Sequence, residues 1–135
     1  EAMSTDGWGS SAMLYALVEG LAGITDTDTC FRQIALSPRW AAADIKTADI
    51  QLEYAASGSA IGYHYEQSDG RCQLTIESSK CLVDLHLLLP EGQEALTTTV
   101  SGQAVSNRCV KVADSTYVDM ELVVDGEATV DVQFR

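Results

Sequence analysis

Basic residues are scarce in this chain. Lys and Arg together number 8 among 135 residues, against 20 Asp and Glu, so that the formal net charge is −12 at pH 7. A chain this acidic repels the phosphates of nucleic acids and the anionic head groups of lipids. We therefore expect neither nucleic acid nor a membrane as a partner.

Long hydrophobic runs are missing as well. None of them approaches the roughly 20 apolar residues that a helix needs to cross a bilayer, so we expect no membrane-spanning helix. The hydrophobic content is nevertheless 46%, which is too high for a disordered chain. A length of 135 residues is enough for one domain with a substantial core, but not for two independent domains.

Histidine is rare, and no arrangement of residues typical of a metal site is present. His64 and His86 are far apart in the sequence, and no C-x-x-C motif occurs. Both histidines fall in expected strands, which favours a surface or packing role over catalysis. The pair Asp26-x-Asp28 resembles the start of a calcium loop but lacks its central Gly and final Glu. We expect no catalytic residue, no metal and no cofactor in this chain.

The four cysteines, Cys30, Cys72, Cys81 and Cys109, do not predict a disulfide framework. Cys72 and Cys81 each begin an alternating apolar pattern, as expected for two strands joined by a turn at residues 78–79. In that arrangement the two thiols are too far apart to form a bridge, because a disulfide requires Cα atoms within about 7 Å. We interpret both residues as small buried hydrophobic side chains.

The N-terminal region is predicted to form an α-helix that has lost its partner. Apolar residues recur there at helical spacing, at Met13, Leu14, Leu17, Val18 and Leu21. The helix carries one charge, Glu19, and a helix that is apolar nearly all round normally lies inside a larger structure. The chain also opens on Glu1-Ala2-Met3 without an initiator methionine or a signal peptide. We therefore expect a piece of a longer protein.

From residue 25 onward the pattern changes to the alternation of β-strands. The expected strands cover residues 31–36, 50–54, 61–66, 72–77, 81–89, 96–100, 110–112, 118–122 and 128–134. Turn signals between them include Ser68-Asp69-Gly70, Pro90-Glu91-Gly92 and Asp125-Gly126. Short strands separated by such turns predict an all-β fold, namely an antiparallel β-sandwich preceded by one N-terminal α-helix.

Aromatic side chains are candidate sugar-binding groups, because the faces of pyranose rings stack on them. Tyr63 and Tyr65 share the apolar phase of their strand and are predicted to lie in the core. Trp40 follows Ser37-Pro38-Arg39 and is expected to tie the start of a strand to the helix. Trp8, in the turn Gly7-Trp8-Gly9 before the helix, is the aromatic residue most suited to a functional role.

Several motifs resemble the C-terminal region of the six-hairpin (α/α)-barrel glycosidases, a superfamily that includes bacterial rhamnosidases. Residues 8–24 (WGSSAMLYALVEGLAGI), followed by the strand at 31–36 and by Ser37-Pro38-Arg39-Trp40, are similar to the last barrel helix and the element after it. In that superfamily a C-terminal antiparallel β-sandwich follows. Three later segments resemble motifs of this sandwich: LLLPEG at 87–92, VSGQAV at 100–105 and STYV at 115–118.

The resemblance implies a division of the chain and a non-catalytic role. Residues 1–24 would be the terminal helix of an upstream (α/α) barrel, and residues 25–135 the C-terminal β-sandwich domain. The catalytic acid and base would lie in the barrel, and the sandwich would pack on it and stabilise it. Carbohydrate would be bound through the parent enzyme, a glycoside hydrolase, for which a periplasmic or secreted location is compatible with the resemblance.

Two further assignments concern sugar contact. Asp6 and Trp8 match a region that approaches the active-site end of the barrel in some members, so the resemblance makes them candidate substrate-proximal residues. The alternative function is an independent carbohydrate-binding module, in which Trp40 would be the residue that binds the sugar. That alternative requires an exposed aromatic platform, which the phase of Tyr63 and Tyr65 does not favour.

Overall fold

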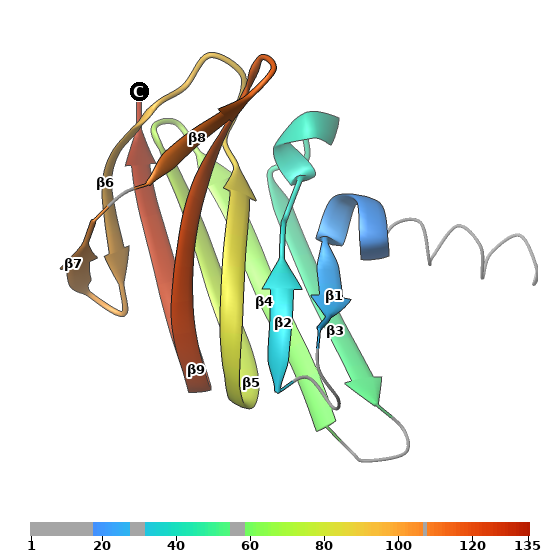
Figure 1. Cartoon of the computed structure of the whole chain (residues 1–135). Coiled ribbons are helices and arrows are strands. Elements are labelled where there is room, and N and C mark those ends of the chain that lie inside the picture. The colour runs from blue at the N-terminus through green and yellow to red at the C-terminus, as the bar shows by residue number, and fades with distance from the viewer. Residues whose placement is uncertain (1–17, 28–31, 55–58, 107) are drawn as a thin grey trace, which may run out of the picture.

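Strands make up most of the computed structural model, which describes residues 18–27, 32–54, 59–106 and 108–135 (Figure 1). Over these residues nine strands form a single mixed sheet, and the predicted all-β class is confirmed. The strands are β1 (Ile24–Asp26), β2 (Gln33–Leu36), β3 (Thr47–Tyr54), β4 (Ser59–Ser68), β5 (Arg71–Leu88), β6 (Ala95–Val100), β7 (Gln103–Val105), β8 (Cys109–Val112) and β9 (Ser115–Phe134).

Within the described residues, two short helical segments accompany the strands. The first, η1 (Val18–Ala22), is a π-helical turn, and the second, η3 (Trp40–Ala43), is a 3₁₀-helix. Most of the α-helix expected near the N-terminus lies outside the described residues, and η1 is its described end. Ala22 and Ile24 both belong to the hydrophobic core, so the end of the segment assigned to an upstream barrel also packs against the strands.

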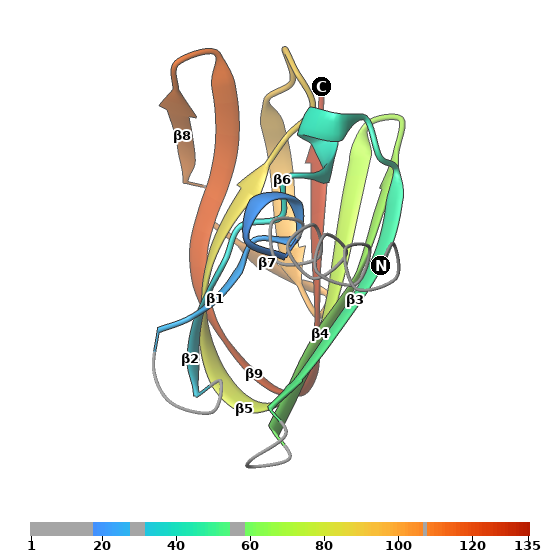
Figure 2. The ribbon, with the colours of Figure 1, turned by 90° about the vertical axis from the view of Figure 1, so that its right-hand side faces the viewer.

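The two longest strands, β5 and β9, pass from one layer of a sandwich to the other. Residues 71–78 of β5 pair with β4 and with the end of β9, whereas residues 82–85 pair with β2. We call β3, β4, β6, β7 and the adjoining halves of β5 and β9 the β4 layer. The β2 layer consists of β1, β2, β8 and the other halves of β5 and β9. Figure 2 shows the two layers edge-on, joined where β5 and β9 bend.

A β-bulge marks this bend and corrects two of the predicted turns. Ser78 pairs with Gly126 and Cys81 pairs with Val124, so β5 advances three residues where β9 advances two. The extra residue shifts the alternation by one, so that residues 72–78 and 81–87 both present their apolar side chains to the core. The turns expected at 78–79 and 125–126 are therefore bends inside continuous strands.

The predicted burial of Cys72 and Cys81 is confirmed, but the two thiols are kept apart along one strand and not on two strands. Cys72 and Cys81 are buried free thiols on the same strand, and Cys109 is an exposed free thiol. Burial raises the pKa of the Cys72 thiol to about 12, so this group stays protonated and acts as an apolar side chain. Cys30 lies outside the described residues.

One strand pairing departs from the predicted antiparallel arrangement. β2 and β5 are parallel, with Ile34 opposite Val83 and Leu36 opposite Leu85. The physical reason is the bend in β5, because its second half crosses into the β2 layer and then runs in the direction of β2 (Figure 1). The remaining pairings are antiparallel.

The core lies between the inner faces of the two layers. Tyr63 and Tyr65 are buried there, as their phase predicts, together with the aliphatic side chains of Ile34, Leu36, Ile61, Leu74, Ile76, Val83, Leu85, Leu87, Val118, Val124, Val130 and Val132. Full burial of one Leu, Ile or Val side chain contributes about 1.5–3 kcal/mol. Most outward positions of the same strands are polar, and Leu82 and Val123 are exceptions. The two outer faces are the places where a site could form.

Candidate functional site

Trp40, the residue considered for sugar binding, lies in the interior. Its residue surface is 4% exposed, and its indole Nε1–H donates a hydrogen bond to the Tyr63 hydroxyl oxygen at 2.8 Å. The Tyr63 hydroxyl in turn donates to the carbonyl oxygen of Ala22 at 2.7 Å. Burial raises the pKa of Tyr63 well above its ordinary value. Trp40 thus links β4 to the end of η1 and presents no exposed face on which a sugar could stack.

The other two candidate residues, Asp6 and Trp8, lie outside the described residues. Their assignment as substrate-proximal groups stays a prediction.

A groove of about 520 Å³ opens on the outer face of the β4 layer. Strand register brings Gln51, Gly62 and Glu77 side by side across β3, β4 and β5. The next outward row on the same strands contains Asp49, His64 and Thr75. Because Gly62 has no side chain, the surface is hollow in the first of these rows, between Gln51 and Glu77.

Close backbone packing explains why glycine occupies position 62. A Cβ atom built on Gly62 would lie 2.8 Å from the carbonyl oxygen of Ile50 on β3. That distance is too short for a carbon–oxygen contact, so any larger residue would force the two strands apart. The absence of a side chain at Gly62 therefore permits the tight β3–β4 pairing and also leaves room for the groove.

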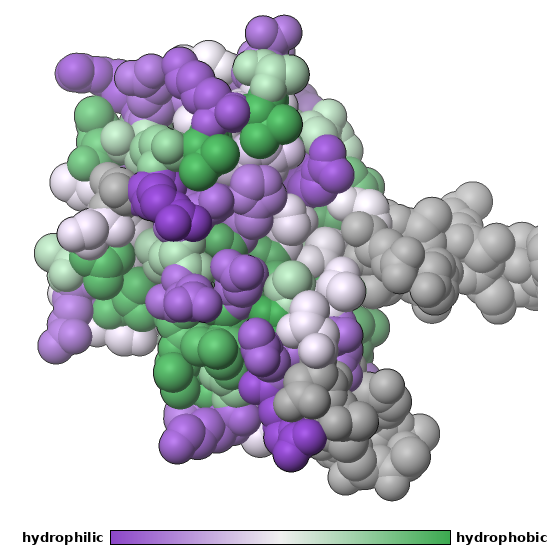
Figure 3. Space-filling model, in the orientation of Figure 1, coloured by the Kyte–Doolittle hydropathy of each residue, from purple (hydrophilic) through white to green (hydrophobic). Residues whose placement is uncertain are grey.

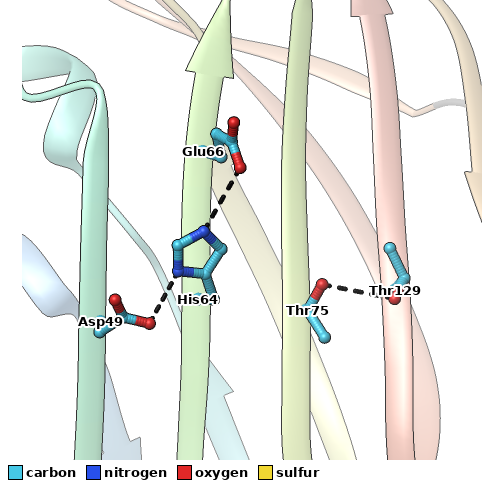
Figure 4. A network of polar contacts seen from close by, with 5 residues as sticks. All are labelled: Asp49, His64, Glu66, Thr75 and Thr129. Carbon is cyan, nitrogen blue, oxygen red and sulfur yellow. Dashed lines mark hydrogen bonds and ion pairs between the residues drawn. The ribbon is translucent and has the colours of Figure 1, made fainter.

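A histidine held between two carboxylates borders the groove (Figure 4). His64 Nδ1 lies 2.7 Å from Asp49 Oδ1 on β3, and His64 Nε2 lies 3.4 Å from Glu66 Oε2 on β4. The hydrogen bond to Asp49 is the largest cause of a raised His64 pKa, to which Glu66 also contributes. The protonated ring donates from both nitrogens, so it connects the two strands across the polar face.

Replacing His64 with Gln should destabilise the chain more at low pH than at high pH. The folded-state pKa of His64 is raised above the ordinary value of 6.5. Its contribution is therefore fully present below about pH 6.5 and is lost as the pH rises through the raised pKa. We expect the difference in urea midpoint between the native chain and His64→Gln to be larger at about pH 5.5 than at about pH 8.5.

The control for this experiment is Gln51→Ala, which alters the same face without removing a titratable group. Its effect on the midpoint should be equal at the two pH values. A His64→Gln effect that is also independent of pH would contradict the assigned pairing.

The second histidine belongs to the outer face of the β2 layer. His86 Nδ1 pairs with Asp119 of β9, and its ring stacks on Tyr117 with centroids 3.8 Å apart. Arg108 lies 3.8 Å from the same Asp119 carboxylate. Asp84, the neighbour of His86 in the sequence, is not its partner here. The contacts are those of a packed surface histidine, in agreement with the packing role expected from the sequence.

Sequence reasoning missed the groove, although each of its side chains followed the expected alternation. The outward phase of Gln51 and Glu77 was evident from their apolar neighbours, but their proximity depends on the register of three strands. Across the described ranges, no group of three or more His, Cys, Asp or Glu is placed to hold a metal ion. Among those same residues, no helix is both long enough and apolar enough to cross a membrane.

Comparison with known proteins identifies the fold in two glycoside hydrolases. An α-L-rhamnosidase from Dictyoglumus thermophilum matches over 84% of this chain with a TM-score of 0.60 and 12% sequence identity. A GH127 β-L-arabinofuranosidase from Geobacillus stearothermophilus T6 matches over 83% with a TM-score of 0.51 and 18% identity. This chain spans only 12% of the first protein and 16% of the second. No protein-family model and no curated protein sequence matches the chain.

Proposed function

We propose that this chain is the non-catalytic β-sandwich region of a glycoside hydrolase, and that it packs on and stabilises an upstream catalytic (α/α) barrel of the same polypeptide. The supporting observation is the asymmetry of the structural match. The fold covers 84% of this chain but only 12% of the rhamnosidase. In the rhamnosidase, the matching sandwich is therefore a small part of a much larger chain.

The outer face of the β4 layer has the chemistry of a surface that stays in water. Its outward positions hold the carboxylates of Asp49, Glu53, Glu66, Glu77, Glu127 and Asp131. Arg71, which pairs with Asp131, and His64 offset only part of this negative charge. Burying so many carboxylates against another domain would carry a large desolvation cost.

The outer face of the β2 layer is better suited to contact with another domain. Val123 is 59% exposed and lies opposite Leu82 across the β5–β9 pairing, and Val112 is 53% exposed. Figure 3, which looks onto this layer, shows hydrophobic side chains gathered over the lower parts of β5 and β9. On the same face, Asp119 pairs with His86 and Arg108, whereas Asp84 and Glu121 are exposed and lie opposite each other. The apolar end formed by Leu82 and Val123 is therefore the part of this face that suits a contact with another domain.

The described start of the chain joins this layer at its edge. η1 leads through Gly23 into β1, which is the edge strand of the β2 layer. We assign the outer face of the β2 layer, centred on Val123 and Leu82, as the surface that meets the barrel.

The test uses the native polypeptide purified from its source, whose intact mass should correspond to several times 135 residues. In that polypeptide, Val123→Asp should place a charge in the contact and destabilise the sandwich by about 2 kcal/mol or more. The matched control is Thr97→Asp on β6, which adds the same charge at an exposed position of the opposite outer face. Thermal unfolding should show a lower midpoint for Val123→Asp alone.

Two outcomes would refute the proposal. One is a native polypeptide of 135 residues. The other is a pair of variants that lower the unfolding midpoint equally.

The alternative function, an independent carbohydrate-binding module, loses its candidate residue. Trp40 is 4% exposed and presents no face on which a sugar could stack.

A further inference from the structure

We infer that the groove over Gly62 is a binding site for a neutral saccharide. It lies on the outer face of the β4 layer, opposite the face that we assign to the barrel contact. A site there would remain open in a larger protein. This inference depends only on the residues of the groove. It does not depend on whether the chain is part of a hydrolase.

The groove has the size of a small-molecule site. Its volume is about 520 Å³, within the range of roughly 300–1,000 Å³ that is common for ligand pockets. Gly62 forms its floor, and the paired strands on either side form its walls. Because these walls are regular strands rather than loops, the positions of the lining side chains are well defined.

Three of the polar side chains that line the groove can bind ligand hydroxyls. Gln51 offers both a donor and an acceptor, Thr75 offers a hydroxyl that can act in either role, and Glu77 offers acceptor oxygens. In the described part of the chain, the side chains of Gln51 and Glu77 make no hydrogen bond or ion pair. Among the described residues, the one hydrogen-bond partner of the Thr75 hydroxyl is the Thr129 hydroxyl, at the long distance of 3.4 Å. These groups are therefore available to ligand hydroxyls.

The charge of the groove excludes anionic ligands. Asp49 and Glu66 both pair with His64, whose ring carries at most one positive charge, and Glu77 adds a further negative charge. The field of this cluster, on a chain of net charge −12, repels phosphates, sulfates and uronic acids. A ligand that enters must be neutral or positive.

Divalent cations and aromatic ligands also fit poorly. Asp49 and Glu66 are paired with His64, and Glu77 lies opposite Glu127. Among the described residues, no group of three or more His, Cys, Asp or Glu is placed to hold a metal ion, so a divalent ion finds too few ligands here. The ring of Tyr63 is buried beneath the groove, with its hydroxyl bonded to Ala22, so no exposed aromatic face is offered. A small neutral polyol, able to donate to Glu77 and to both donate to and accept from Gln51, matches what remains.

Binding should be measurable in the 135-residue chain by ¹⁵N NMR titration with L-rhamnose and L-arabinose. Without aromatic stacking we expect a dissociation constant on the order of 1 mM. The amide signals of Gln51, Gly62 and His64 should shift together, and glucuronate and spermidine should not reproduce the shifts. Gln51→Ala and Glu77→Gln, both at exposed positions, should each weaken binding about fivefold to tenfold.

The matched control is Val123→Thr on the opposite outer face, which should bind the sugar as the native chain does. Three results would overturn the inference: no shift with either sugar, shifts caused by glucuronate or spermidine instead, or unchanged binding by the two groove variants. Because the titration needs no barrel, its failure would leave the proposed hydrolase assignment intact. A native polypeptide of 135 residues would refute that assignment and leave the groove inference intact.

Discussion

Gly23→Ala is expected to destabilise the chain by about 3 kcal/mol or more. Gly23 connects η1 to β1 with φ at +70°, a left-handed conformation that costs a side-chain-bearing residue stability. A Cβ atom there would overlap the carbonyl group of Ser37. The backbone cannot easily move aside, because Ser37 N donates to Gly23 O at 2.8 Å and the flanking Ala22 and Ile24 are both in the core.

Urea unfolding monitored by tryptophan fluorescence would measure this effect, with Gly20→Ala as the control. A Cβ atom on Gly20, within η1, would have no neighbour within 4 Å. That substitution should change the free energy of unfolding by no more than about 1 kcal/mol, in the stabilising direction if η1 keeps its helical turn. Equal losses for the two variants would mean that the Gly23–Ser37 approach does not restrict position 23.

Trp40→Ala is expected to reduce the free energy of unfolding by about 3–5 kcal/mol. The substitution removes a large side chain that is 4% exposed, and it also removes the hydrogen bond from the indole N–H to the Tyr63 hydroxyl. Tyr63→Phe should cost about 1–3 kcal/mol, because it leaves both the Trp40 donor and the Ala22 carbonyl without this partner. Both losses can be obtained from urea titrations at neutral pH.

A suitable control is Val112→Ala, at a position that is 53% exposed. That substitution should stay within about 0.5 kcal/mol of the native chain. If Tyr63→Phe were as mild as Val112→Ala, the hydrogen-bond chain from Trp40 to Ala22 would contribute nothing to stability.

Together these two predictions concern how the N-terminal segment is attached to the sandwich. Gly23 packs against the chain that follows β2, and the Trp40–Tyr63 pair binds the end of η1. Residues 22–24 are therefore held against the strands by packing and by hydrogen bonds. This attachment suits the proposed role, in which the sandwich stabilises a preceding barrel.

The local sequence pattern predicts most of the strands, but it does not predict that β5 and β9 each continue through a bend. The hairpin signal at Ser68-Asp69-Gly70 does join β4 to β5, with Ser68 opposite Arg71. Gly126 instead lies inside β9, where its positive φ accompanies the bend between layers. A glycine beside polar residues looks the same in the sequence whether the chain reverses or only bends. The difference depends on the strand that pairs with it.

The amino-acid sequence by itself determined the all-β class and the inward position of Tyr63 and Tyr65. These properties follow from the two-residue period of a strand, which needs only neighbouring residues to be recognised. The tertiary structure alone decided the bulge between Ser78 and Cys81, the parallel pairing of β2 with β5, the burial of Trp40 and the groove over Gly62. Each of these depends on register or packing between segments far apart in the chain, which no local period encodes.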